Sequence, residues 1–249
     1  MSFKDHFSKR AAQYAAYRPS YPAALFAYLA ECCPARRAVW DCACGNGQAT
    51  LGLAERFDSV IATDASPQQV AAAPARDNVT YRVAPAEDSG IESSSLDLVT
   101  VAQALHWFNL DDFYREVERV LKPSGILAVW TYGVLHVDDA AADALIQEFY
   151  YDTVGPYWPP ERRFVEDGYR SLAFPFVEIS PPALNMEVLW ERAHLLGYLR
   201  TWSATGRYVA ERHVDPVAQL EERLAKVWPD AQDRRKVTWP LALRVGQKH

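Results

Sequence analysis

The sequence has no apolar run long enough to cross a membrane, no excess of positive charge and no apolar leader. Its longest apolar stretch, residues 96–107, is interrupted by polar side chains and falls short of the roughly 20 residues that a membrane helix needs. The net charge of −6 is the wrong sign for a surface that gains affinity by neutralising phosphates. Because the N-terminus is polar and lacks the apolar run of a secretory signal, we expect a cytoplasmic protein. The negative charge disfavours nucleic acid as a partner, and no membrane partner is expected.

Cysteine is also scarce. The four cysteines, Cys32, Cys33, Cys42 and Cys44, fall within thirteen residues, but they are adjacent or alternate rather than spaced as C-x₂₋₄-C. Two ligands from each pair do not converge easily on a tetrahedron, so we expect no metal. Cys42 and Cys44 are expected to act as small apolar side chains in the first strand and its loop.

The remaining composition is that of a globular protein, with 49 % hydrophobic and 23 % charged residues in a chain of 249. Residues 38–131 alternate short apolar runs with helical patterns, which is typical of βαβ units and a parallel sheet. We expect strands at residues 38–41, 60–63, 79–83, 96–102 and 126–130. We expect helices between them at residues 48–57, 67–75 and 111–121.

The regions that flank this alternation have a different pattern. Helical patterns occur at residues 5–16, 22–33, 138–172 and 187–227. A short strand is expected at residues 176–180 and a final strand at residues 236–245. Pro240 lacks a backbone N–H, so it is expected to confine the final strand to an edge or a bulge.

A glycine loop follows the first expected strand. Gly45 and Gly47 form a tight turn into a helix, where a ligand can approach the backbone closely. A dinucleotide fingerprint needs a third glycine or alanine where Thr50 stands, and the carboxylate of Asp41 would repel a pyrophosphate. The same carboxylate attracts S-adenosylmethionine, which carries a sulfonium and an ammonium group.

A second acidic residue ends the next strand. Asp64 follows Gly47 by seventeen residues, where folds of this kind use a carboxylate to accept hydrogen bonds from ribose hydroxyls. The alternative is a turn or cap residue, because Ser66 and Pro67 follow it.

These motifs resemble those of the class I S-adenosylmethionine-dependent methyltransferases. Residues 41–47 read Asp-Cys-Ala-Cys-Gly-Asn-Gly and match the acidic-x-Gly-x-Gly-x-Gly motif, except that Ala43 replaces the first glycine. The resemblance implies an α/β fold, with a Rossmann-like, doubly wound, mostly parallel seven-stranded sheet and helical cap insertions. It also implies that S-adenosylmethionine is bound and that S-adenosylhomocysteine is the product.

The resemblance also assigns the cofactor-binding residues. Those expected along the methionine moiety, with the acid before them, are Asp41, Ala43, Gly45, Asn46 and Gly47. Those expected at the ribose and adenine are Asp64 with Ala65, and Ala86 with Glu87. Gln103, at the end of the fourth strand, is expected to offer its backbone oxygen to the ammonium group.

Residues 103–108 lie where an acceptor must meet the methyl group. His106 is expected to position the acceptor, or to take a proton from a hydroxyl or amine. The alternative is that His106, Trp107 and Phe108 only seal the loop. The acid-Pro-Pro-aromatic sequence of enzymes that methylate DNA or protein nitrogens is absent here, which disfavours such acceptors.

Two further stretches refine the resemblance. Tyr14 and Arg18 are expected to close over the cofactor, and residues 13–22 together with 103–108 and 197–203 resemble the trans-aconitate methyltransferase-like branch, which esterifies small carboxylic acids. Arg200 and Arg207 are further candidates for holding an acid, unless they face solvent.

The whole chain, 1–249, is interpreted as one methyltransferase domain with a cofactor-binding core at about 36–131. Lid elements are expected at residues 1–35, 133–172 and 186–230. The lids carry four of the eight tryptophans, so we expect an acceptor pocket with apolar walls, closed to water, with arginines inside. Two alternatives stay open: a catalytically silent module that binds the cofactor and acts through protein partners, and, less favoured, a nicotinamide dehydrogenase.

Overall fold

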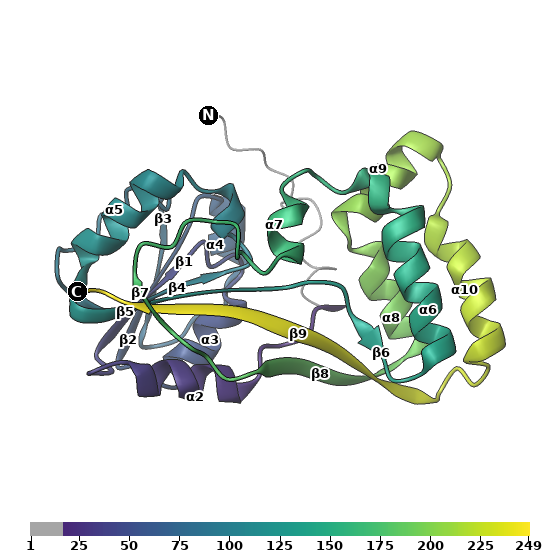
Figure 1. Cartoon of the computed structure of the whole chain (residues 1–249), viewed down its shortest axis with the longest axis horizontal. Helices are drawn as coiled ribbons and strands as arrows, with labels where there is room; N and C mark the ends of the chain where they lie inside the picture. Colours follow the sequence, from purple (N-terminus) through teal and green to yellow (C-terminus); the bar gives the residue numbers. More distant parts are fainter. Residues whose placement is uncertain (1–16) are drawn as a thin grey trace.

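The computed structural model describes residues 17–249. Figure 1 shows a twisted sheet flanked by helices, and a second group of helices at one end of the molecule. Two long strands run from the sheet to that group. The expected helix at 5–16 and Tyr14 lie outside the described residues.

Five parallel strands form the first part of the sheet, in the order β3-β2-β1-β4-β5. Strands β4 and β5 are buried almost throughout, because helices cover both faces of a parallel sheet. The five are β1 (Ala38–Cys42), β2 (Ser59–Asp64), β3 (Val79–Val83), β4 (Leu96–Ala102) and β5 (Leu121–Tyr132). All five expected strands are confirmed, although β5 begins earlier than residue 126.

Four further strands complete a mixed sheet. They are β6 (His136–Val137), β7 (Val177–Ile179), β8 (Leu184–Glu191) and β9 (Arg234–Gln247). Strand β9 runs antiparallel to β5, with β7 and β8 on its other side, and β6 pairs with β9 just beyond the end of β5. The nine strands therefore fill seven positions in the sheet, and the expected Rossmann-like α/β fold is confirmed.

Two expectations about this end of the sheet were wrong in detail. Residues 187–191 belong to β8, so the helical region begins five residues later than expected. Strand β9 is an inner strand, although Pro240 lies within it. Pro240 is tolerated there because β5 ends opposite Leu241 and β6 begins only opposite Thr238, which leaves the ladder interrupted beside the proline.

Helices cover the two faces of the sheet. Helices α2 (Ala23–Cys32) and α3 (Gln48–Ala54) bury Leu25 and Leu53 against one face. Helix α5 (Leu110–Val120) buries Phe113 and Val117 against the other face. The short helix α4 (Pro67–Ala72) contacts β2 and β3. Ser66 caps it by accepting a hydrogen bond from the backbone N–H of Gln69.

The second group of helices packs on the far ends of β8 and β9 (Figure 1). It contains α6 (Ala140–Glu148), α8 (Arg192–Arg200), α9 (Ser203–Arg212) and α10 (Pro216–Val227), and we call these four helices the cap. Short turns η3 (Phe149–Thr153) and η4 (Gly155–Tyr157) and helix α7 (Arg162–Glu166) lead from α6 back toward the sheet. Trp190 and Trp228 are buried in the core that holds the cap together.

Within residues 17–249 no helix is long and apolar enough to cross a bilayer. The same residues contain no group of three histidine, cysteine or acidic side chains arranged to hold a metal ion. The four cysteines are free thiols, and Cys42 and Cys44 are buried, as expected of small apolar side chains.

Candidate functional site

The carboxyl ends of β1, β2 and β4 meet at one edge of the sheet. Strand β1 lies between β2 and β4, so the order of the strands reverses there, and a crevice opens outside strand ends at such a point. The glycine loop between β1 and α3 lies in this position, and the strands bring the residues expected around a cofactor to the same edge.

The glycine loop has three residues in the left-handed region. The φ angles of Ala43, Gly45 and Gly47 are 54°, 56° and 86°. A Cβ on Gly45 would meet no atom within 4 Å, whereas a Cβ on Gly47 would lie 2.7 Å from Tyr81 Oη. The backbone at Gly45 therefore faces open space, and that at Gly47 faces the protein.

Replacing Ala43 with glycine is expected to raise the free energy of unfolding by about 1 kcal/mol, because an L-residue is strained at this φ. Urea denaturation measures the change. The matched control is Ala49→Gly in helix α3, where the same exchange is expected to lower stability. An equal loss of stability in both variants would contradict the strain at Ala43.

Asp41 lies beneath this loop and is fully buried. Its Oδ2 accepts a hydrogen bond from Thr50 Oγ1 at 2.6 Å, and its Oδ1 accepts one from Thr100 Oγ1 at 3.1 Å. The pKa of Asp41 is raised to about 6, because burial, with a smaller contribution from the charge of Asp64, outweighs the hydrogen bonds from the two hydroxyls. Because each carboxylate oxygen of Asp41 already has a hydroxyl partner, the expected effect of Asp41 on a ligand is through its charge.

Asp64 ends β2 beside the loop and is held there by backbone groups. Its Oδ2 accepts from the N–H of Gly45 at 2.8 Å, and its Oδ1 accepts from the N–H of Ser66 at 2.8 Å. Burial raises the pKa of Asp64, and the two N–H groups oppose that rise. Each carboxylate oxygen has a second lone pair, so the ribose role and the turn role are compatible. Ala65 is exposed next to it.

Two residues expected near an adenine lie in the loop after β3. Ala86 is buried, and Glu87 Oε1 accepts a hydrogen bond from the backbone N–H of Asn109 at 3.0 Å. Asn109 precedes α5, so Glu87 also holds the start of that helix.

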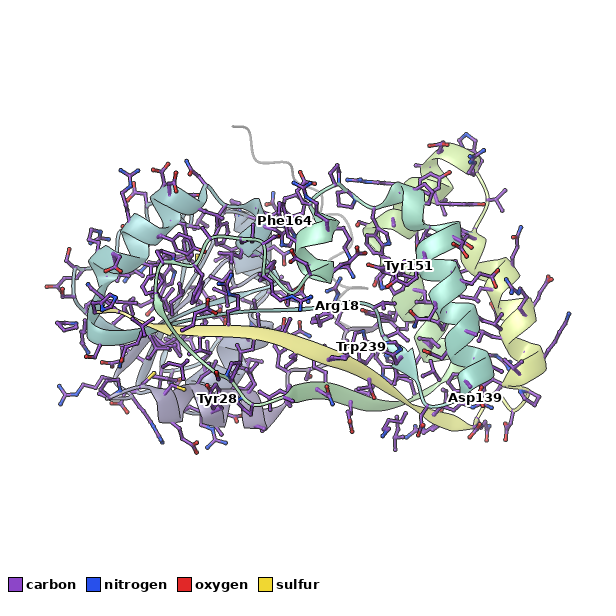
Figure 2. The ribbon with its side chains drawn as sticks, viewed as in Figure 1. Arg18, Tyr28, Asp139, Tyr151, Phe164 and Trp239 are labelled. Carbon is purple, nitrogen blue, oxygen red and sulfur yellow. The ribbon has the colours of Figure 1, made fainter. Side chains whose placement is uncertain are left out.

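Gln103 and Arg18 lie where the loop region meets the cap. Gln103 has a φ of 61°, and its side chain accepts from Thr131 Oγ1 at 2.7 Å and donates to the carbonyl oxygen of Tyr132 at 3.3 Å. Arg18 Nη1 donates to Tyr132 Oη at 2.7 Å. Figure 2 shows Arg18 in the middle of the molecule, between the sheet and the cap.

A cavity of about 370 Å³ opens at this place. Its walls come from the ends of β4 and β5, from α7 and from α9, and from the residues that join them. Aromatic rings line it together with three arginines: Trp107, Tyr132, Trp158, Tyr198, Trp202, Arg18, Arg162 and Arg207. These walls and arginines have the character expected of the acceptor pocket, and the assignment of the acceptor to this cavity stays a prediction. In the described residues the cavity is open to solvent, because Trp107 is 46 % exposed and Arg207 is exposed. The expected lid also includes residues 1–16, which lie outside the described residues, so closure to water stays a prediction.

His106 lines the cavity, and its ring is fixed by aromatic neighbours. Nδ1 lies 2.9 Å from Tyr169 Oη, and the ring packs against Trp107 at 4.7 Å between centroids. Burial and, to a smaller degree, the nearby charge of Arg162 lower the pKa of His106 to about 4. His106 is therefore neutral at pH 7, and Nε2 can face a ligand while Nδ1 is held by Tyr169.

An NMR titration of histidine-labelled protein tests this state. The His106 ring is expected to stay neutral down to pH 5.5, because burial and Arg162 both disfavour its charged form. A His106→Gln variant assigns the signal by its disappearance. A titration midpoint near 6.5, the ordinary histidine pKa, would contradict the buried environment.

The structure separates the two arginines that the sequence analysis grouped together. Arg200 is exposed and forms ion pairs with Asp215 at 3.0 Å and Glu221 at 3.4 Å, so it does not face the cavity. Of the two alternatives left open for Arg200, the structure favours the solvent-exposed one, because the side chain turns toward α10. Arg207 lines the cavity and donates from Nη1 to the carbonyl oxygen of Tyr157 at 3.4 Å.

Three residues of the site were missed by the sequence analysis. Tyr132 ends β5, and the rule that ligands lie at the carboxyl ends of parallel strands points to it. Arg162 and Tyr169 lie in the segment after α6, where the sequence shows only a helical pattern and nothing that indicates contact with β4.

The comparisons with known proteins agree with this arrangement. A family model described as a methyltransferase domain matches residues 40–129. A predicted methyltransferase of Dictyostelium discoideum is 32 % identical over 252 residues, which cover 99 % of this chain and 96 % of that protein. A predicted S-adenosylmethionine-dependent methyltransferase of Saccharomyces cerevisiae is 33 % identical over 49 % of this chain and 45 % of its own length.

A solved structure extends the similarity to the cap. A predicted type II methyltransferase from Anaeromyxobacter dehalogenans has 44 % sequence identity and a TM-score of 0.89, over 93 % of this chain and 98 % of that chain. The similarity therefore covers the glycine loop, the sheet and the cap together. The chain belongs to the class I S-adenosylmethionine-dependent methyltransferases.

Proposed function

We propose that this methyltransferase transfers the methyl group to a small carboxylic acid and so forms a methyl ester, as in the trans-aconitate methyltransferase-like branch. The observation that carries the proposal is the cavity at the strand ends, which combines aromatic walls with Arg18, Arg162 and Arg207. Guanidinium groups bind carboxylates well, and aromatic walls suit an apolar body. We further propose that the whole chain works as one domain in which the cap carries the acceptor wall.

The cofactor is proposed to lie across the glycine loop, with the methionine part along Ala43, Gly45, Asn46 and Gly47. Open space at the Gly45 backbone and the buried charge of Asp41 support this placement. The remaining proposed contacts are Asp64 and Ala65 at the ribose, Ala86 and Glu87 at the adenine, Gln103 at the ammonium group, and Tyr14 and Arg18 closing over the site.

The chemistry is an in-line displacement. A carboxylate oxygen of the acceptor attacks the methyl carbon, and the carbon–sulfur bond breaks as the carbon–oxygen bond forms. A carboxylate and a sulfonium become a neutral ester and a neutral thioether, so charge is lost along the reaction, which an apolar wall favours. The acceptor has no proton to lose, so His106 positions it. A base role for His106 is proposed only for a hydroxyl or amine acceptor.

An acceptor screen tests the proposal. The protein is incubated with S-adenosylmethionine that carries a labelled methyl group and with sets of acids, phenols and amines that share one carbon skeleton. We expect label in the acids, and release of that label as methanol after mild alkali. Transfer to phenols or amines but not to acids would refute ester formation. Tight binding of S-adenosylhomocysteine without transfer to any compound would favour the catalytically silent module.

A further inference from the structure

Arg162 has a place in the cavity that the expected roles do not explain. It is the first residue of α7, which lies between the sheet and the cap (Figure 1). It lines the cavity beside Trp158, and its charge acts on the ring of His106. A ligand that enters the cavity between the strand ends and the cap would therefore lie next to the guanidinium group of Arg162.

The side chain of Arg162 is held in one orientation. Nε donates a hydrogen bond to Tyr150 Oη at 2.7 Å, and Tyr150 Oη in turn donates to Glu166 Oε1 at 2.7 Å. The guanidinium carbon lies 4.6 Å from the centre of the Trp158 ring, which fixes the plane of the group. Because Nε is taken by Tyr150, the two Nη nitrogens form the end of the group that can bind a ligand.

Arg162 has no direct ion pair in the part of the chain that the structure describes, and the carboxylate of Glu166 is linked to it only through the hydroxyl of Tyr150. No carboxylate there forms an ion pair with Arg162, and its hydrogen-bond partner is the neutral hydroxyl of Tyr150. Two arginines on the outside of the cap differ in this respect, since Arg200 pairs with Asp215 and Arg223 pairs with Glu148 at 2.6 Å. A fixed guanidinium in a partly buried cavity, without a direct ion pair to its Nη nitrogens, favours an anionic ligand.

We propose that the two Nη nitrogens of Arg162 bind a carboxylate group of the acceptor, and that Arg162 thereby selects acids that have an apolar body. This inference rests on the proposed function and adds the residue that determines the acceptor. A carboxylate offers two coplanar oxygens to the two Nη nitrogens, so the contact is bidentate. The rings of Trp107, Trp158 and Trp202 line the remaining wall and bind the apolar part.

Binding is tested first, with the protein saturated with S-adenosylhomocysteine. The probe is phenylacetate, compared with the neutral phenylacetamide by calorimetry. We expect the wild type to bind phenylacetate more tightly, and Arg162→Gln to lose about 10- to 100-fold in affinity for the acid but not for the amide. Arg162→Lys keeps the positive charge but loses the two coplanar Nη nitrogens, and its affinity for phenylacetate is expected to lie between those of the wild type and Arg162→Gln. Arg163→Gln is the matched control, because Arg163 is exposed on the same helix and packs over Phe164.

Kinetics with an acid from the acceptor screen separate binding from chemistry. Arg162→Gln is expected to raise KM at least about tenfold and to change kcat less, because the ion pair forms in the ground state and weakens as the ester forms. Tyr150→Phe keeps the ring but removes the hydroxyl that holds Nε, and is expected to give a smaller rise in KM. In Arg162→Gln the pKa of His106 is expected to rise.

Equal affinity of the wild type and Arg162→Gln for phenylacetate would overturn the inference. An equal loss of affinity for S-adenosylhomocysteine would also overturn it, because Arg162 would then only support the fold. Preference for benzyl phosphate over phenylacetate would overturn the carboxylate assignment. Acid binding that depends on Arg162, without methyl transfer to any acid, would uphold this inference while the proposed function fails. Methyl transfer to acids that is unaffected in Arg162→Gln would refute this inference while the proposed function stands.

Discussion

Replacing Asp41 with asparagine is expected to raise the free energy of unfolding by about 2 kcal/mol at pH 8, while weakening the binding of S-adenosylmethionine at least about tenfold. The gain arises because the buried carboxylate has a pKa of about 6 in the folded protein, above its ordinary value of 3.8. Ionising such a group opposes folding. The loss of affinity arises because the amide lacks the negative charge beneath the glycine loop.

The pH dependence follows from the same shift. Below pH 3.8 the carboxyl group is protonated in both the folded and the unfolded chain, so Asp41 does not disfavour folding. As the pH rises through about 6, the unfolded chain has already released its proton and the folded protein is forced to ionise, so stability falls. The advantage of Asp41→Asn is therefore expected to grow between these values and to stay constant above pH 7. The hydroxyl of Thr100 can then accept a hydrogen bond from the new amide N–H₂, because its own proton can be donated to the carbonyl oxygen of Trp40 instead.

Asp97 is the control for Asp41. Burial alone would raise the pKa of Asp97, but Lys122 and the backbone N–H groups of Ala38 and Arg37 outweigh it, and the pKa is lowered. Asp97→Asn is therefore expected to lower stability at pH 8, the opposite sign to Asp41→Asn. Urea denaturation from pH 4 to pH 8 measures the stability effect, and calorimetry with S-adenosylmethionine measures the effect on binding. A stability loss in Asp41→Asn at pH 8 would contradict the burial argument.

Gly45→Ala is expected to abolish most cofactor binding while leaving the fold in place. The added Cβ would meet no protein atom within 4 Å, so the steric cost falls on the ligand that approaches the loop. The backbone cost is about 1 kcal/mol, and Ala43 shows that alanine is accommodated at a φ close to that of Gly45. Calorimetry is expected to show a loss of at least about tenfold in affinity for S-adenosylhomocysteine. Unchanged affinity would place the cofactor elsewhere.

Gly47→Ala gives the contrasting result, because its Cβ would lie 2.7 Å from Tyr81 Oη at a φ of 86°. We expect a loss of about 2 kcal/mol or more in the free energy of unfolding. Adding Tyr81→Phe removes the clashing oxygen and is expected to restore part of that loss. A double variant no more stable than Gly47→Ala would show that the strained φ, and not Tyr81, sets the cost.

The strands and the order of the expected cofactor residues could be predicted from the sequence, because both are encoded in short stretches of neighbouring residues. Strand patterns, Gly45, Gly47 and Asp64 lie in a fixed order along the chain, and the rule about strand ends places them at one edge. The departure at Ala43 was also visible, although only the structure shows that its φ of 54° is the one that glycine prefers.

The acceptor half was less predictable. Arg200 and Arg207 lie on neighbouring helices. The packing of α8 against α10 decides that Arg200 pairs with Asp215, and the packing of α9 against η4 decides that Arg207 reaches the cavity. Arg162 depends on Tyr150 and Trp158 for its orientation, and no spacing rule indicates those contacts. Side chains positioned by tertiary packing leave no periodic signal in the sequence.

Strand β9 also affects how the molecule is made. It follows in the chain every strand with which it pairs, yet it lies inside the sheet between β5 and the pair β7 and β8. During synthesis on the ribosome, β5 therefore presents an unpaired edge until the last of these strands has emerged. Strand β5, which carries Tyr132 at the cavity, and strand β8, which leads into the cap, both pair with this late segment, so we expect the two sides of the cavity to take their final shape together.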